Sequence, residues 1–255
     1  MPLATEIILF FGGILAGVIN TLAGNGSTLT VSLLLFGGLD GATANASNRI
    51  GVIAQTVTGI FSIKKTSRRN YLFLKGKNLI LPTFLGSLLG GILGSQISPD
   101  MMELSLAIVM TAMLFTLFWG EKRWTGSSES VRGLSPFKSA LYFFLIGFYG
   151  GYVQMGIGVL MLSVLVLADK WSLRDANVIK LLMAAILAIP AGMIYIYNDL
   201  IIWRPSLILA FGSVLGAWFG ARYVIRIPEA QRYVRWLLIF VVSAGALQAI
   251  YKAIL

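Results

Sequence analysis

Two short polar stretches interrupt otherwise apolar runs, and each contains a pair of glycines separated by one residue. The first stretch holds Gly24 and Gly26. The second holds Gln154, followed two residues later by Gly156 and then by Gly158. Glycine lets backbone N–H groups approach a ligand closely, and a helix that starts after such a break points unpaired N–H groups and its positive dipole end at that ligand. This chemistry favours an anion. The alternative is that the glycines only permit tight packing while the polar residues cap helices.

A second group of polar residues has helical spacing in the two long apolar runs that follow these breaks. Asn45, Asn48 and Arg49 lie at i, i+3 and i+4, and Asn177 and Lys180 lie at i and i+3 in the second half. A cation inside a membrane helix costs roughly 3 kcal/mol or more unless it faces protein or water. Arg49 and Lys180 are therefore predicted to attract an anion. The alternative is that both cations reach out to the membrane interfaces.

These positions form one predicted substrate-binding set. Its members are the polar and glycine residues of the two breaks and of the two long runs: Asn20, Thr21, Gly24, Asn25, Gly26, Ser27, Thr28, Asn45, Asn48, Arg49, Gln154, Gly156, Gly158, Asn177 and Lys180. No catalytic residue, metal site or cofactor is predicted. The sequence has no Cys and no His, which removes thiol chemistry, imidazole bases and the usual transition-metal ligands. No carboxylate lies deep in an apolar run, so a carboxylate proton relay is unsupported, and H⁺ or Na⁺ coupling stays open.

The composition predicts that these residues lie inside a membrane. Of the 255 residues, 57% are hydrophobic and 12% are charged, whereas soluble domains carry about 25% charged residues. The mean hydropathy is +0.84, and so little polar surface cannot cover a globule in water. The net charge of +10 comes from connections between apolar runs, which fits positive-inside topology better than nucleic-acid binding.

Apolar runs punctuated by Gly, Pro and charge predict an all-α, polytopic transmembrane bundle. The expected helices are 6–23, 27–36, 42–63, 77–97 and 101–119, then 137–155, 159–168, 176–197, 201–223 and 234–254. A polar stretch divides the chain. We therefore expect a first transmembrane repeat at 1–120, a cytoplasmic linker at 121–136 and a second repeat at 137–255.

The two halves share features in the same order. Gly24 and Ala44 recur 132 residues later as Gly156 and Ala176. Such recurrence indicates internal duplication. Two series at a spacing of four also correspond, and small residues at this spacing indicate close helix packing: Gly86, Gly90, Gly94 and Gly212, Gly216, Gly220.

Corresponding connections have opposite charge character. The connection at 64–77 is basic and its counterpart at 198–204 is not, whereas 95–103 is acidic and 222–235 holds four arginines. The halves are therefore predicted to be inverted repeats, each with a broken-helix hairpin plus three spanning helices. The positive-inside rule places 64–77 and 121–138 in the cytoplasm and both termini outside. Whether the hairpins are re-entrant or fully spanning stays open.

Four motifs carry a family resemblance. AGVINTLAGNGS at 16–27 and ANASNR at 44–49, with GFYGGYVQMGIG at 147–158 and ANVIK at 176–180, resemble the TauE/SafE family. The resemblance implies export of sulfite, or transport of organosulfonates and related anionic sulfur compounds, across the plasma membrane. Many members have a richer glycine run than the GNGS and GIGV of this chain, so the exact substrate and the direction of transport stay open.

The predicted function is a carrier, not an enzyme, that moves a small anion across the plasma (inner) membrane by alternating access around a midplane site. Its partners are the anion and the lipid bilayer; no nucleic acid is expected, and a homodimer is left open. One alternative is an anion channel or a non-transport membrane partner protein. Another is an intramembrane hydrolase using Ser27 and Lys180, which would lack a His or a buried acid to orient its base.

Overall fold

The structure, a computed structural model, describes residues 2–22, 24–62, 67–119, 134–222, 236, 239–240 and 242–247. Its elements are α1 (Leu3–Leu22), α2 (Gly26–Phe36), α3 (Gly41–Ser62), α4 (Ser67–Gln96), α5 (Pro99–Trp119), α6 (Pro136–Tyr152), α7 (Ile157–Leu162), the π-helix η1 (Ser163–Ala168), α8 (Leu173–Tyr197) and α9 (Trp203–Arg222). The described residues contain no strand, so the all-α prediction is confirmed for them. Most of the predicted linker at 121–136 and of the helix at 234–254 lies outside the described residues.

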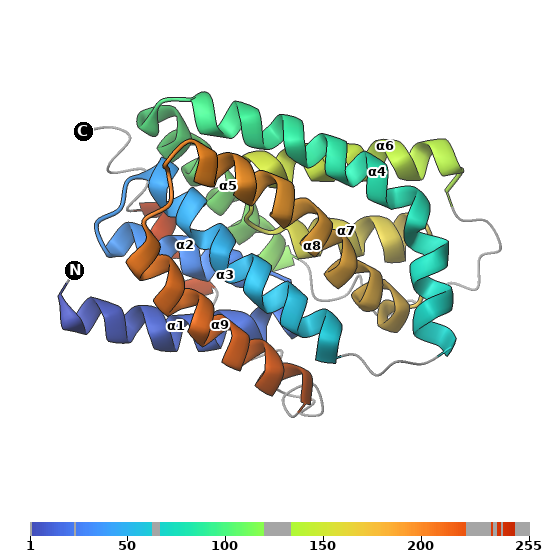
Figure 1. The fold of residues 1–255 in the computed structure, drawn as a ribbon, viewed down its shortest axis with the longest axis horizontal. Helices are drawn as coiled ribbons and strands as arrows, with labels where there is room; N and C mark the ends of the chain where they lie inside the picture. The colour runs from blue at the N-terminus through green and yellow to red at the C-terminus, as the bar shows by residue number, and fades with distance from the viewer. Residues whose placement is uncertain are drawn as a thin grey trace.

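Most helix bounds fall within three residues of the predicted ones, but α4 starts ten residues earlier than expected. The connection predicted at 64–77 is therefore wrong from Ser67 onward, where the chain is helical. Arginine, lysine and leucine are good helix formers, so a basic stretch continues a helix as readily as it ends one. Pro82 of α4 lacks the backbone N–H that would donate to the carbonyl of Asn78. The N-terminal part of α4 is bent away from the direction of the rest of the helix (Figure 1).

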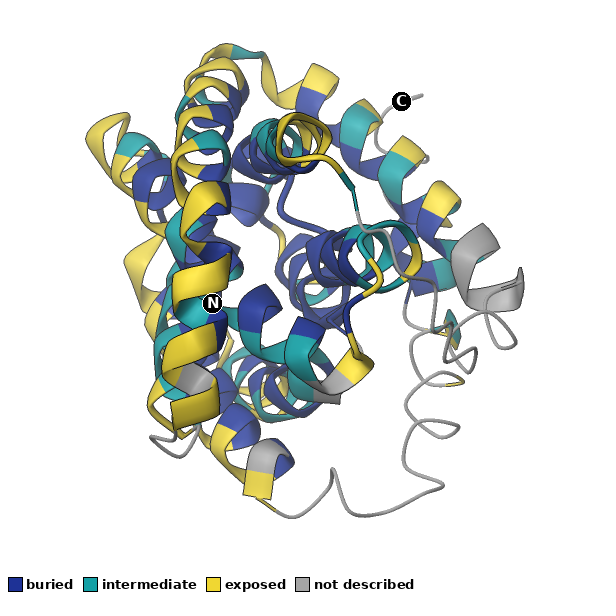
Figure 2. Ribbon diagram, turned by 90° about the vertical axis from the view of Figure 1, so that its right-hand side faces the viewer, coloured by how far each residue is buried: buried dark blue, intermediate teal, exposed yellow. Residues whose placement is uncertain are grey.

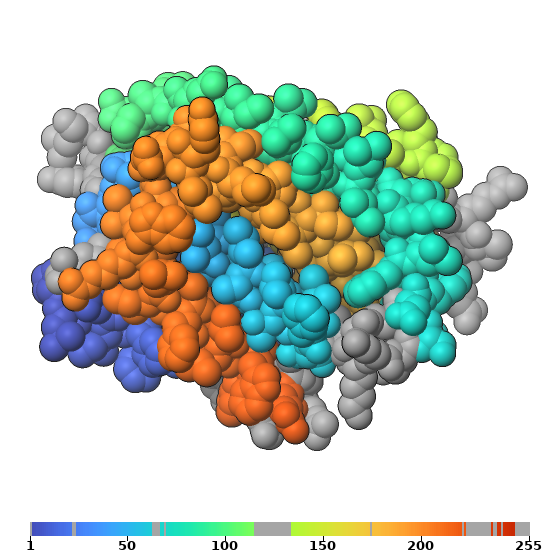
Figure 3. All heavy atoms as spheres, in the orientation of Figure 1, coloured from blue at the N-terminus to red at the C-terminus, as the bar shows by residue number. Residues whose placement is uncertain are grey.

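The helices pack in a continuous series, in the order α1, α9, α3, α8, α4 and α6. Figure 3 shows α9, α3, α8 and α4 side by side across one face. The short helix α2 packs on α1 and α3, and α7 packs on α6 and α8. The two ends of the series, α1 with α9 and α4 with α6, have the most extensive contacts. Each of these two pairs joins a helix of the first half to a helix of the second.

Glycine faces bring these two helix pairs together. A Cβ on Gly216 of α9 would overlap the backbone carbonyl of Ile14 in α1, and one on Gly90 of α4 would overlap the carbonyl of Phe148 in α6. No residue with a side chain fits at this backbone-to-backbone separation. The packing role that the sequence predicts for these two glycine series is confirmed.

One end of the molecule gathers the starts of α1, α3, α5 and α9, at the left of Figure 1. Glu6 of α1 pairs with Arg204 of α9 at 2.7 Å. The N–H of Gly41 donates to the Glu103 carboxylate of α5 at 3.2 Å. We call it the acidic end, because acids prevail among its charged residues: Glu6, Asp40, Asp100, Glu103, Asp199 and Arg204.

The opposite end gathers the starts of α4, α6 and α8. Arg68 pairs with Asp175 at 2.6 Å, and the hydrogen bonds with this carboxylate raise the pKa of the Arg68 guanidinium. The N–H of Leu134 donates to Asp169 at 2.9 Å, so the chain enters α6 and leaves η1 at the same end, as the sequence predicts. We call it the basic end, because bases outnumber acids among its charged residues. The bases are Arg68, Lys75, Lys77, Lys138 and Lys170, and the acids are Asp169 and Asp175.

The outer faces of the bundle are apolar. Phe11 of α1, Leu81 of α4 and Phe211 of α9 are each more than 60% exposed, and exposed residues follow the outer faces of the helices (Figure 2). Apolar surface on this scale suits lipid rather than water. Among the described residues, three helices are long and apolar enough to cross a membrane: Leu3–Thr21, Asn70–Gln96 and Asp175–Tyr197.

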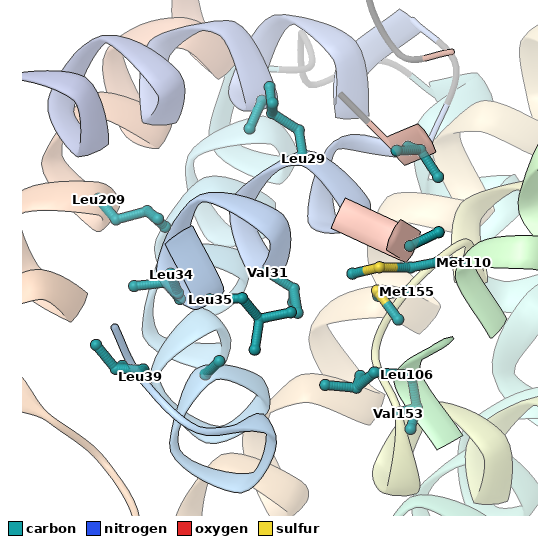
Figure 4. Packing of buried hydrophobic residues seen from close by; sticks show 14 of the residues in the cluster. Leu29, Val31, Leu34, Leu35, Leu39, Leu106, Met110, Val153, Met155 and Leu209 are labelled. Atoms are coloured by element: carbon teal, nitrogen blue, oxygen red, sulfur yellow. The ribbon is translucent and has the colours of Figure 1, made fainter. Parts of the chain in front are cut away.

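The interior holds the break between α6 and α7 in place. Val153 and Met155, on either side of Gln154, are fully buried. They lie beside Leu106 and Met110 of α5 in a core cluster that also contains much of α2 (Figure 4). Burying these apolar side chains stabilises the segment beyond the helical hydrogen bond that the N–H of Val153 donates to the carbonyl of Tyr149 at 2.7 Å.

Candidate functional site

The two breaks touch each other. Gly24 and Gly156 have φ angles of +78° and +68°, in the left-handed region that glycine adopts without steric cost. A Cβ on Gly24 would lie 2.7 Å from the Cα of Gly158, and one on Gly158 would lie 2.5 Å from the Cα of Gly24. The hairpin of α1 and α2 has its base at the acidic end and that of α6 and η1 at the basic end. Their tips therefore meet inside the molecule.

The α1–α2 break is closed by a side chain from α1. The N–H of Gly26, the first residue of α2, donates to Oδ1 of Asn20 at 2.7 Å. The Thr21 hydroxyl donates back to the carbonyl of Gly17 at 2.9 Å. Asn25 occupies the N-cap position of α2 without making a side-chain cap, and its Oδ1 is buried without a partner. Asn20 thus fixes the direction in which α2 starts.

The α6–α7 break is held by Asn45 of α3. The Asn45 amide donates to the carbonyl of Tyr152 at 2.8 Å, and its Oδ1 accepts the N–H of Gln154 at 3.5 Å. Asn48, one turn further along α3, accepts a hydrogen bond from the Thr30 hydroxyl of α2. The two asparagines therefore connect α3 to both hairpins.

Arg49 binds the end of α6 instead of a cavity. Its guanidinium donates to the carbonyls of Gly150 (3.0 Å), Gly151 (2.6 Å) and Tyr152 (3.2 Å), and it lies 4.2 Å from the centre of the Tyr195 ring. The last carbonyls of a helix have no intrahelical donor and carry partial negative charge, so a cation stabilises them. Arg49 is fully buried, which excludes its predicted alternative of reaching a membrane interface.

Lys180 of α8 is also buried, with 3% of its surface exposed. Its ammonium donates to Oδ1 of Asn177 at 2.8 Å and to the backbone carbonyl of Asn20 at 3.3 Å. Reaching an interface is excluded for Lys180 as well. Unlike Arg49, it lines a cavity at the hairpin tips.

That cavity has a volume of about 40 Å³, which is room enough for water. Its lining comes from both hairpins and from α3, α8 and α9: Gly17, Asn20, Thr21, Gly24, Ser27, Val52, Gln55, Thr56, Gln154, Ile157, Gly158, Lys180, Leu181, Ala184, Leu187 and Ala217. No carboxylate is among these lining residues, and Lys180 is their one cation.

Two helices start at this cavity. Ser27 lies in the first turn of α2, and Ile157 and Gly158 lie in the first turn of the helical segment Ile157–Ala168. N–H groups in a first turn have no carbonyl partner within their helix. Together with the Lys180 ammonium they make the cavity electrostatically suited to an anion.

The predicted set divides into two groups. Those that line the cavity are Asn20, Thr21, Gly24, Ser27, Gln154, Gly158 and Lys180. Those that do not are Asn25, Gly26, Thr28, Asn45, Asn48, Arg49, Gly156 and Asn177. Among the second group, Asn45, Arg49 and Asn177 contact helix ends or Lys180.

Sequence reasoning missed Gln55 and Thr56 of α3, which both line the cavity. Gln55 is 4% exposed, and its Oε1, like that of Gln154, is buried without a hydrogen-bond partner. Gln55 lies seven residues after Asn48, two helical turns along the same face. This spacing could have predicted Gln55 as a site residue from the sequence. The apolar lining residues have no comparable pattern in the sequence.

Comparison with known proteins decides the family. The profile described as "Sulfite exporter TauE/SafE" matches residues 9–249, nearly the whole chain. This chain belongs to the TauE/SafE family. The match includes both breaks and the two long helices α3 and α8, and it confirms the resemblance that the four sequence motifs indicate.

The curated TauE/SafE-like relatives are named as probable membrane transporter proteins. YfcA of Escherichia coli K12 is 26% identical over 249 residues, covering 96% of this chain and 90% of the relative. ORF9 of a Sinorhizobium species is 26% identical over 243 residues (94% and 90%), and a Haemophilus influenzae protein is 27% identical over 228 residues (86% and 84%). No solved structure matches the chain.

These names identify a family of membrane transporters and not of enzymes. The positions of Ser27 and Lys180 also argue against the alternative of an intramembrane hydrolase. Ser27 and Lys180 both line the cavity, but no hydrogen bond joins their side chains among the described residues. No lining carboxylate is available to orient a base.

Proposed function

We propose that this protein is a secondary transporter that carries a small anion, sulfite or an organosulfonate, across the plasma membrane by alternating access. The cavity at the touching hairpin tips carries the proposal. There the Lys180 ammonium and two helix starts converge without any carboxylate in the lining. The family and the named relatives, all transporters, supply the class of activity.

In this proposal Lys180 supplies the charge that holds the anion. Backbone N–H groups near Ser27 and Gly158 donate to its oxygens, and the amides of Gln55 and Gln154 complete the polar lining. Asn45, Arg49 and Asn177 act indirectly by holding the helix ends and Lys180 in place.

The packing supports inverted repeats. The pair α1 with α9 has a counterpart in α4 with α6, and α3 with α9 has a counterpart in α4 with α8. The two buried cations show the same correspondence between the halves. Arg49 of the first half binds α6 of the second, and Lys180 of the second half binds α1 of the first. Two hairpins that enter from opposite ends and touch at their tips suit alternating access by rocking of one repeat against the other.

The charge distribution gives this arrangement an orientation. We assign the basic end to the cytoplasm and the acidic end, with the start of α1, to the outside, following the positive-inside rule. The broken hairpins would then enter from opposite faces and stop at each other.

A binding experiment tests the proposed site. Purified protein is titrated in a thermal-shift assay with sulfite, sulfate, thiosulfate, sulfoacetate, taurine and lactate, with and without sodium. We expect sulfite to stabilise the wild type, and Lys180→Met to weaken its affinity by roughly tenfold or more, because a hydrogen bond to a charged group contributes about 1.5–3 kcal/mol.

The matched control is Lys138→Met, at an exposed lysine of the basic end. Its sulfite affinity should equal that of the wild type. If no anion in the panel binds, or if Lys180→Met binds sulfite as tightly as the wild type, the site is misassigned.

A further inference from the structure

Lys180 lies where an isolated positive charge is costly. It is 3% exposed, on a helix apolar enough to cross a membrane. Both acceptors of its ammonium, the Asn177 amide and the Asn20 carbonyl, are neutral groups. A buried ammonium without a counter-ion pays a large desolvation cost. A bound anion removes this cost, but an empty carrier has to return to the other side of the membrane without one.

No other described group is placed to neutralise Lys180. The cavity lining holds no second titratable side chain. Arg49 of α3 is bound to the carbonyls at the end of α6. Tyr149 of α6 donates its hydroxyl to the carbonyl of Met155 at 2.8 Å. Tyr195, on α8 itself, donates its hydroxyl to the carbonyl of Tyr152 at 3.1 Å. The acid of α1, Glu6, is paired with Arg204 at the acidic end.

The hydrogen bonds of Lys180 fit both of its protonation states. An ammonium has three N–H donors, and the two hydrogen bonds to Asn177 and Asn20 leave one for a ligand in the cavity. A neutral amine has two N–H donors, which the same two acceptors satisfy without a ligand. The site can therefore hold an anion when Lys180 is an ammonium, and it can be empty when Lys180 is a neutral amine. No N–H donor of Lys180 is left unpaired in either state.

We propose that Lys180 carries one proton together with each anion, which makes the protein a proton–anion symporter. This inference rests on the proposed function. On one side of the membrane the amine takes a proton from water and binds the anion as an ammonium. On the other side the anion leaves, the ammonium returns its proton to water, and the carrier goes back with a neutral amine. One H⁺ and one anion cross per cycle, so transport of a singly charged anion moves no net charge.

Lys180→Arg separates the two activities of this residue. Arginine keeps a positive charge for the anion but does not lose its proton in proteins. In proteoliposomes, exchange of radiolabelled sulfite for unlabelled sulfite needs no empty return, whereas net uptake driven by a pH gradient does. We expect the variant to retain exchange at a reduced rate. Its ratio of net uptake to exchange should fall by on the order of tenfold or more, because moving an unpaired buried cation costs several kcal/mol.

Lys138→Arg is the control, and its ratio should equal that of the wild type. Sulfite takes up protons itself, but this property is the same for every variant, so the difference between them isolates Lys180. A Lys180→Arg protein whose net uptake follows the pH gradient as the wild type does would overturn the inference. Wild-type vesicles that exchange neither sulfite nor an organosulfonate would instead refute the proposed function.

A measurement on the wild type decides the matter if Lys180→Arg loses exchange as well. Net uptake is followed below neutral pH, where singly charged hydrogen sulfite prevails, with potassium diffusion potentials of either sign across the vesicle membrane. Symport with a proton predicts uptake that is insensitive to the potential. Uptake accelerated by an inside-positive potential would show that net negative charge crosses with each anion, which contradicts symport of one proton with hydrogen sulfite.

Discussion

At the scale of single residues, two cations that look alike in the sequence have different surroundings. Arg49 and Lys180 lie at similar places in two related long helices, and the sequence predicts the same electrostatic role for both. In the structure, Arg49 uses its forked donors on three consecutive carbonyls, while Lys180 makes two hydrogen bonds beside a cavity. We assign stability of the α6–α7 break to Arg49 and anion binding to Lys180.

This division predicts different consequences of removing each cation. Arg49→Ala removes the guanidinium from the carbonyls of Gly150, Gly151 and Tyr152. The last two keep hydrogen bonds from Tyr195 and Asn45, whereas the carbonyl of Gly150 loses its side-chain donor, and a buried acceptor without a partner costs about 1–3 kcal/mol. We expect a lower thermal midpoint for purified Arg49→Ala, weaker transport, and normal membrane insertion. Arg49→Lys, with a single point of attachment, should fall between Arg49→Ala and the wild type.

Sulfite affinity distinguishes the two roles. It should fall less in Arg49→Ala than in Lys180→Met, since Arg49 does not line the cavity. An Arg49→Ala protein with wild-type thermal stability and strongly reduced sulfite affinity would reverse the assignment.

At the scale of elements, the sequence was most informative about helices and breaks. Apolar runs and glycines predicted the breaks near Gly24 and Gly156, and both glycines adopt positive φ angles. Charge was a poor guide to the start of α4, because helix propensity and membrane boundary are separate properties. The contact between Gly24 and Gly158 could not be predicted, because it depends on how two hairpins far apart in the sequence pack together.

The tip contact can be tested with matched glycine substitutions. Gly24→Ala combines an unfavourable positive φ, which costs about 1–2 kcal/mol, with an overlap of its Cβ with Gly158. Gly38→Ala shares the positive φ, but nothing lies within 4 Å of its Cβ. We expect Gly24→Ala to lose most sulfite exchange in proteoliposomes, while Gly38→Ala retains most of it. Equal exchange in the two variants would mean that the tip contact has no part in transport.

At the scale of the whole molecule, the charge pattern of the sequence predicts which connections lie together. Arg68 with Asp175 and Leu134 with Asp169 bring the predicted cytoplasmic segments to one end, while Glu6 with Arg204 lies at the other. Seven of the fifteen predicted site residues line the cavity. Of the other eight, Asn45 and Arg49 bind the end of α6 and Asn177 binds Lys180. Which side chains face the cavity and which hold its surroundings depends on packing between distant helices, which a single sequence does not contain.

In the proposed mechanism, two hairpins enter the membrane from opposite faces and meet at an anion site. The chain has no cysteine, so single cysteines report position without background. Phe36→Cys lies at the base of the first hairpin and Lys170→Cys at the base of the second, and both positions are exposed. Each variant is treated with a membrane-impermeant maleimide in intact and in permeabilised cells.

We predict that Phe36→Cys is labelled in intact cells and that Lys170→Cys is labelled only after permeabilisation. Labelling of both cysteines from the same face of the membrane would exclude this arrangement, because the hairpins could not then approach each other from opposite sides.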